Sequence, residues 1–176
     1  MSSHCFHIYP KPPYDFELNC RVFGYEKPMP EFFEEGVWRR AIRLDSGRLI
    51  PVALRSLGTV EESKIEAKYF QTITEQEREE LSGNLDWMFS FSQDLTALYA
   101  FMDKDPVLRG LKLKFCGLKA GSIGATVFES IIKSIIQQQI SIRVAFSITK
   151  KMVTRFGETV EAEDIIYYDF PTVEAC

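Results

Sequence analysis

The sequence predicts an α+β fold in which an antiparallel sheet comes first and a set of helices follows. Between residues 14 and 70, short runs rich in β-branched and aromatic residues alternate with glycine-containing turns, a pattern typical of strands. After residue 70, apolar residues recur at every third and fourth position, which is typical of amphipathic helices. Of the 176 residues, 45% are hydrophobic and 13% are aromatic, enough to form a packed core. Strands followed by helices are the order expected of an α+β protein.

Four strands are expected in the first part of the chain. We place them near residues 15–23, 37–44, 48–57 and 63–70. The first has a clean alternation, in which Phe16, Leu18, Cys20 and Val22 are separated by polar residues. Such alternation favours an antiparallel sheet with one face exposed to solvent.

Helix starts are indicated by residues that satisfy the unpaired amides of a first turn. Thr74 and Glu77 have the spacing of a capping box, and Gly83 is expected to end that helix. A second helix is indicated by the spacing of apolar residues over 95–102. Asp105 followed by Pro106 predicts the start of a third.

A pair of apolar-striped helices forms the strongest pattern in the sequence. Thr126 begins the first as part of a second capping box with Glu129, and its stripe consists of Phe128, Ile131, Ile132, Ile135 and Ile136. The second is expected over residues 142–156. The two are joined by Gln137 to Ser141, whose three consecutive amides should face solvent or a ligand, because buried amides need several hydrogen bonds each. Ser141 is expected to cap the second helix and to leave a phosphate seat there, although a plain polar hairpin tip explains the same residues.

Charge is unevenly distributed along the chain. The 21 basic and 25 acidic residues give a net charge of -4. Residues 108–155, however, hold nine basic residues against the single acid Glu129, a local charge of +8 that indicates an anionic partner or a solvated helix face.

Several classes of protein are excluded on the sequence. No apolar run is long enough to span a bilayer, and residues 1–16 lack the pattern of a signal peptide, so a cytoplasmic protein without a membrane partner is expected. The four cysteines are scattered, which argues against a disulfide framework or a zinc ribbon. A metal site is not predicted at His4, Cys5 and His7, because a fourth ligand is lacking and the terminus that carries them is expected to be mobile. Trp38 beside Arg39 is interpreted as packing rather than as a stacking platform.

The helix pair carries a family resemblance. The run from Val127 to Ser141, with Ala145 and Arg155-Phe156-Gly157-Glu158, resembles the "FEALVRAILGQQVS...A...RFGE" signature of the helix-hairpin-helix DNA glycosylases. Downstream, Phe170-Pro171-Thr172-Val173-Glu174-Ala175 is similar to the family's "FPTPEAL". The sheet region is similar to the amino-terminal domain of the 3-methyladenine DNA glycosylase II type, whereas the "GQxFRW" motif of the alternative 8-oxoguanine branch is absent.

The resemblance implies a TATA-binding-protein-like antiparallel sheet with flanking helices over residues 1–72, followed over residues 73–176 by the first helices of an all-α DNA glycosylase domain. It implies base-excision repair in which an alkylated base is flipped out of double-stranded DNA and its N-glycosidic bond is hydrolysed. Neither a metal nor an organic cofactor is expected. In a prokaryote the protein would act at the nucleoid.

The site implied by the resemblance is a DNA-binding one. Its expected residues are Gln138, Gln139, Ser141, Lys150 and Lys151. The family's helix-hairpin-helix loop and catalytic aspartate follow the segment that ends this chain, and Asp164 and Asp169 precede it. We therefore expect the front part of a longer enzyme, inactive alone, with apolar helix faces that promote self-association. The alternative is a DNA-binding or interaction module without catalysis.

Overall fold

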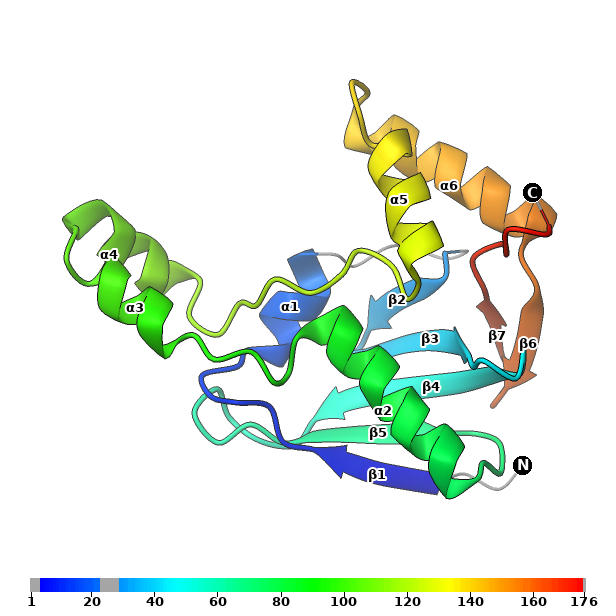
Figure 1. The fold of residues 1–176 in the computed structure, drawn as a ribbon, viewed down its shortest axis with the longest axis horizontal. Coiled ribbons are helices and arrows are strands. Elements are labelled where there is room, and N and C mark those ends of the chain that lie inside the picture. The colour runs from blue at the N-terminus through cyan, green and yellow to red at the C-terminus, as the bar shows by residue number, and fades with distance from the viewer. Residues whose placement is uncertain (1–3, 23–28, 176) are drawn as a thin grey trace.

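A five-stranded antiparallel sheet is the centre of the computed structural model, which describes residues 4–22 and 29–175 (Figure 1). Its strand order is β1-β5-β4-β3-β2. The strands are β1 (His4–Ile8), β2 (Glu31–Glu34), β3 (Val37–Arg43), β4 (Leu49–Ser56) and β5 (Ile65–Tyr69). Three of the four expected strands, corresponding to β3, β4 and β5, are confirmed.

Helices and one small hairpin make up the rest of the described chain. They are α1 (Phe16–Val22), α2 (Glu75–Phe89), α3 (Thr96–Met102), α4 (Pro106–Lys114), α5 (Val127–Ile136), α6 (Ile142–Phe156) and the hairpin β6 (Thr159–Ala162) and β7 (Ile165–Tyr168). The predicted α+β class is confirmed. The division after residue 72 stays a prediction.

One face of the sheet carries the main hydrophobic core, covered by α1 and α2 (Figure 1). Leu81, Leu85 and Phe89 of α2 pack on apolar side chains of β3, β4 and β5. Trp38 is 4% exposed and meets Phe89 edge to face, with ring centroids 4.9 Å apart. The interpretation of Trp38 as a packing residue is therefore confirmed.

The opposite face is covered in part by the β6–β7 hairpin. Ala162 and Tyr167 pack there against Ala41, Ala53 and Phe70 in a second, smaller cluster. The turn between β6 and β7 places Glu163 and Asp164 at positive φ, and no sequence signal had indicated this hairpin.

The expected strand over residues 15–23 is wrong, because residues 16–22 form α1. Asp15 starts the helix by accepting a hydrogen bond from the Leu18 amide at 2.9 Å. Phe16, Asn19 and Cys20 are buried, a spacing of three and four residues that fits a helix as well as the alternation fitted a strand. Residue 23 lies outside the described residues.

Two further expectations are corrected. His4 to Ile8 form the edge strand β1, paired with β5, instead of a mobile terminus. Gly83 lies inside α2, which continues to Phe89 and ends where Ser90 adopts a left-handed conformation (φ 51°). The capping box of Thr74 and the Asp105 cap with Pro106 in the first turn are present as predicted.

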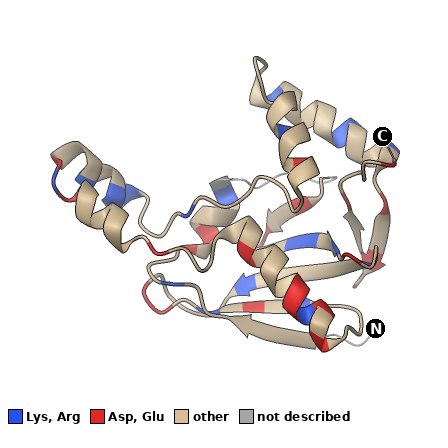
Figure 2. Ribbon diagram, in the orientation of Figure 1, with Lys and Arg blue, Asp and Glu red and all other residues tan. Residues whose placement is uncertain are grey.

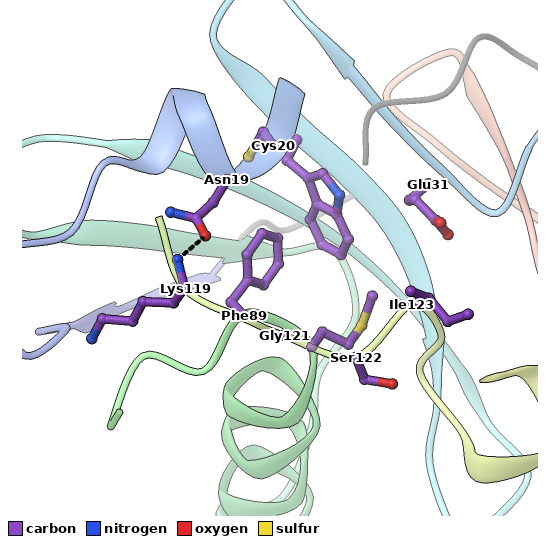
Figure 3. A pocket seen from close by; sticks show the side chains of 10 residues that line it. Asn19, Cys20, Glu31, Phe89, Lys119, Gly121, Ser122 and Ile123 are labelled. Atoms are coloured by element: carbon purple, nitrogen blue, oxygen red, sulfur yellow. Dashed lines mark hydrogen bonds between the residues drawn. The ribbon is translucent and has the colours of Figure 1, made fainter. Parts of the chain in front are cut away.

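The segment between α4 and α5 is tied to the sheet side of the molecule by buried polar side chains. The Asn19 side-chain oxygen accepts from the Lys119 backbone N–H at 3.0 Å (Figure 3), and its Nδ2 donates to the Gly117 carbonyl at 2.8 Å. Gly117 has a positive φ of 79°, and a Cβ there would lie 2.4 Å from the Asp15 nitrogen. A cavity of about 30 Å³ remains between this segment, α1 and α2, with Glu31 on its wall (Figure 3).

Two helical hairpins project from this body as separate arms, α3–α4 on one side and α5–α6 on the other (Figure 1). None of the described helices is long and apolar enough to cross a membrane. Within residues 4–22 and 29–175, no group of three or more His, Cys, Asp or Glu side chains is placed to hold a metal ion.

Candidate nucleic-acid interface

The tip of the α5–α6 hairpin presents the predicted amides on an ordered turn. Gln137 is the C-cap of α5, and its backbone N–H donates to the Lys133 carbonyl at 3.0 Å. Gln138 and Gln139 are exposed, and Gln139 adopts a left-handed conformation with φ 58°. Ser141 caps α6 by accepting from the Val144 amide at 3.4 Å. The tip therefore offers two exposed amide side chains beside a helix start whose first amides lack partners within the helix.

Exposed cations follow the tip along α6. Its buried side consists of Ala145, Thr149 and Val153. Lys150 and Lys151 are exposed; at 100° per residue, Lys151 lies on the side of the helix opposite that stripe and Lys150 lies on its flank. The predicted site residues thus lie on one helical arm and are all exposed. Their roles in binding stay predictions.

The basic stretch is only partly available to a partner. Lys119 is 2% exposed, and its ammonium donates to the carbonyls of Lys11, Phe91 and Gln93 at 2.8, 2.9 and 2.7 Å. Burial lowers the pKa of Lys119. Lys133 is also buried, so the interpretation of the whole stretch as a docking side is wrong for these two residues. The remaining cations divide between α4 and α6 (Figure 2).

Burial on α5 does not follow its apolar stripe. Ile131 and Ile135, in the middle of the apolar stripe, are 52% and 58% exposed. The two charged residues of the helix, Glu129 and Lys133, are each 1% exposed. The expected exposure of apolar helix faces is confirmed, and α5 meets the sheet through its charges.

Four side chains form what we name the buried charge cluster. They are Glu31 of β2, Arg40 of β3, and Glu129 and Lys133 of α5. Arg40 contacts the carboxylate of Glu31 and lies 2.6 Å from Oε2 of Glu129. The Nζ of Lys133 lies 2.7 Å from Oε1 of each glutamate. Each cation therefore contacts both carboxylates, and the four charges sum to zero.

The cluster keeps Glu129 ionised. Burial alone would raise the pKa of Glu129, but the charges of Arg40 and Lys133 outweigh it and lower that pKa to about 2. The carboxylate also accepts from the Ala125 amide at 2.8 Å. Thr126 caps α5 as predicted, accepting from the Glu129 amide at 3.1 Å, but the Glu129 side chain serves the cluster in place of the expected capping box. Sequence reasoning missed the cluster, although the four-residue spacing of Glu129 and Lys133 was a signal for their pairing.

Neither aspartate near the end of the chain is placed as a free carboxylate in a site. Asp169 is 4% exposed and accepts from Arg43 at 2.9 Å. Burial raises the pKa of Asp169, and the charges of Arg40 and Arg43 oppose that rise. Asp164 belongs to the β6–β7 turn. This placement agrees with the expectation that neither is the family's catalytic aspartate.

The fold matches solved DNA glycosylases. The chain superposes on a Clostridium acetobutylicum 8-oxoguanine glycosylase/lyase in complex with double-stranded DNA with a TM-score of 0.67, at 16% identity, over 98% of this chain and 55% of that one. A structure of MBOgg1 in complex with a low-affinity DNA ligand gives a TM-score of 0.69, at 16% identity, over 99% of this chain and 56% of that one. No family model matches the sequence. The fold is therefore that of the amino-terminal portion of a DNA glycosylase.

Within that class, the chain resembles the 3-methyladenine DNA glycosylases. It is 38% identical to the enzyme from Archaeoglobus fulgidus, with a TM-score of 0.84 over 97% of this chain and 57% of that one. It is 31% identical over 102 residues to the DNA-3-methyladenine glycosylase of Bacillus subtilis (strain 168), a match that covers 58% of this chain and 33% of that protein. The chain thus spans about half of the solved relative and a third of the curated one.

Proposed function

We propose that this chain is the amino-terminal portion of a base-excision-repair DNA glycosylase that acts on alkylated bases of the 3-methyladenine type. The observation that supports this most is the combination of 38% identity and a TM-score of 0.84 across nearly the whole chain with the Archaeoglobus fulgidus enzyme. The partner is double-stranded DNA containing a damaged base, in the cytoplasm or at a prokaryotic nucleoid. The 8-oxoguanine glycosylases share the fold at 16% identity. Identity this low does not support assigning their substrate to this chain.

In this function the α5–α6 tip enters the duplex where the damaged nucleotide has been flipped out. Extrusion costs a few kcal/mol of unstacking, and groups that occupy the gap offset that cost. Gln138 and Gln139 are exposed and carry both donors and acceptors, so they hydrogen-bond the base left without its partner. Ser141 and the first backbone amides of α6 bind a DNA phosphate. Lys150 and Lys151 attract the phosphate backbone of the DNA.

Bond cleavage requires a carboxylate beside the developing sugar cation. Asp169 is engaged with Arg43, and Asp164 lies in a hairpin turn. We therefore expect the 176-residue chain to bind DNA that lacks a base without releasing bases itself. Robust base release from methylated DNA by this chain alone would refute that expectation.

The tip is tested with Gln139→Ala and a duplex containing one abasic site. Because Gln139 is exposed at a turn, the variant should fold normally and bind the abasic duplex about tenfold more weakly, the loss expected for roughly one or two hydrogen bonds. Circular dichroism monitors the helices.

Gln139→Gly is the matched control for backbone strain, since glycine adopts the left-handed conformation of this position without cost. If both variants lose affinity equally, the side chain is responsible. Unchanged affinity in both would contradict a role for the tip.

A further inference from the structure

We infer that the buried charge cluster is a positioning device that fixes the α5–α6 arm on the sheet and thereby aims Gln138 and Gln139. This inference rests on the proposed function of the tip. It gives a role in DNA recognition to four residues that do not reach the exposed surface of the arm, namely Glu31, Arg40, Glu129 and Lys133.

The contacts of α5 make the cluster the side on which the helix docks. Among the described residues of α5, the buried ones are Glu129 and Lys133. Both reach the sheet, Glu129 through Arg40 and Lys133 through Glu31. Ile131 and Ile135 are exposed, and the half-buried Phe128 packs edge to face on Phe170 after β7, so the side chains that tie α5 to β2 and β3 are the two charged ones.

Charged contacts of this kind specify one geometry where apolar contacts tolerate several. Each cation is bound by two carboxylates, and Arg40 offers a planar fork whose Nη1 and Nη2 both donate to Glu129, at 3.1 and 2.6 Å. A shift of α5 along the sheet would separate these pairs in a buried setting, where an unpaired charge is costly. The cluster therefore selects one register for the helix.

The same charges fix the segment that leads into α5. Lys133 donates to the Ile123 carbonyl at 3.0 Å, and Glu129 accepts from the Ala125 amide at 2.8 Å. Ser122 and Ser130 are hydrogen-bonded at 2.9 Å. The start of α5 is thus held from both the sheet and its own preceding loop.

Lever length makes this register matter at the tip. At 1.5 Å per residue, the seven helical positions from Glu129 to Ile136 correspond to about 10 Å, and Gln138 and Gln139 lie beyond them. A tilt of about 10° at the cluster would therefore move the tip by about 2 Å or more, enough to break a hydrogen bond. Loss of the cluster should impair recognition of the gap more than attraction to the DNA backbone, which depends on Lys150 and Lys151.

The test compares Lys133→Met with the paired variant Glu31→Gln/Lys133→Met in the full 176-residue chain. The single change leaves two carboxylates with one cation, whereas the paired change keeps the balanced Arg40–Glu129 contact. Arg55→Met is the matched control, since Arg55 forms an ion pair at 2.7 Å with Glu66 on the sheet, away from α5.

Two readouts are measured for each variant. The first is the ratio of affinities for abasic and intact duplexes of the same sequence, which a loss of stability alone would not change in the folded protein. The second is hydrogen exchange of residues 127–136 compared with residues 37–43 and 49–56.

Lys133→Met is expected to lower the affinity ratio about tenfold and to speed exchange in α5 while β3 and β4 stay protected. The paired variant should recover the ratio to within about threefold of the original, and Arg55→Met should change neither readout. An unaltered ratio in Lys133→Met, or a paired variant no better than the single one, would overturn the inference.

Failures of the two proposals are distinguishable. If the unaltered chain shows no preference for abasic DNA, the proposed function fails, and exchange in α5 still decides whether the cluster fixes the helix. If Lys133→Met does not fold at all, the paired variant decides: a recovered ratio supports positioning, and a lowered one contradicts it.

Discussion

Replacing Lys119 separates the lysines that hold the fold from those proposed to contact DNA. The change is Lys119→Met, which keeps much of the side-chain volume and removes the ammonium. The three carbonyls that this group serves lie 2.7 to 2.9 Å away, and its distance to the Tyr14 ring centroid is 5.3 Å.

The magnitude follows from two opposing contributions. Three carbonyls left without their donor cost roughly 1–3 kcal/mol each. Removing the buried ammonium also removes its desolvation cost, which offsets several kcal/mol of that loss. Burial lowers the pKa of Lys119, in line with such a cost. We expect a net loss of about 3 kcal/mol in the free energy of unfolding. With a urea dependence of about 2 kcal/mol per M, the midpoint falls by about 1.5 M.

Urea denaturation and DNA titration are measured on the same protein. The folded variant should keep its affinity for abasic DNA within about twofold, because Lys119 is buried away from the α5–α6 tip. The comparison variant, Lys150→Met/Lys151→Met, should keep its midpoint and lower the slope of log affinity against log salt by about 2. A Lys119→Met protein that lost affinity like this double variant, or kept its urea midpoint, would refute the assignment.

Three further outcomes are expected. The unaltered chain should lose about 3 kcal/mol of stability between about pH 5 and pH 2, because the lowered pKa of Glu129 contributes stability that disappears as the carboxylate is protonated. The variant Glu129→Gln lacks this contribution at every pH. Stabilities of the two proteins that fall in parallel with pH would contradict this. Asp169, whose pKa is raised mainly by burial, acts in the opposite sense in both proteins, and the Glu129 charge is the smallest of the causes of that rise. Asp105→Ala should weaken α4 locally by about 1 kcal/mol, seen as faster hydrogen exchange over residues 106–114 with an unchanged global midpoint. The chain should self-associate in sedimentation experiments, and Ile131→Ser/Ile135→Ser should reduce this, whereas a monomer at all concentrations would exclude it.

The sequence predicted elements correctly where one local signal, such as a capping residue, had a single interpretation. Thr74, Asp105 and Thr126 each begin a helix as predicted, since a capping side chain has few other uses at such a position. The strand prediction for residues 16–22 was wrong because seven residues fit both the two-residue period of a strand and the 3.6-residue period of a helix. The segment is a helix that packs Phe16 and Cys20 into the core. The strand β2 has four residues, too few for any period to be detected.

The candidate site was predictable in its exposed part and not in its buried part. Consecutive amides at Gln138 and Gln139 indicate an exposed tip from their hydrogen-bonding needs alone. Burial of Lys133 depends on Glu31, 102 positions away in the chain, and no local pattern carries that pairing. An apolar stripe also predicts only that a helix face needs cover, so the exposure of Ile131 could not be derived from α5 by itself.

The β6–β7 hairpin has a consequence for the order in which the protein forms during synthesis. It covers the face of the sheet that carries Ala41, Ala53 and Phe70, and its own Ala162 lies over 100 residues beyond Ala53. The sheet and α2 are complete once residue 89 has left the ribosome, yet that face stays uncovered until residue 168 follows. Contacts between such distant segments are slow to form because a long loop must close first. A nascent chain paused within the α5–α6 arm would therefore display a finished sheet with one apolar face unprotected, a state that binds chaperones or aggregates.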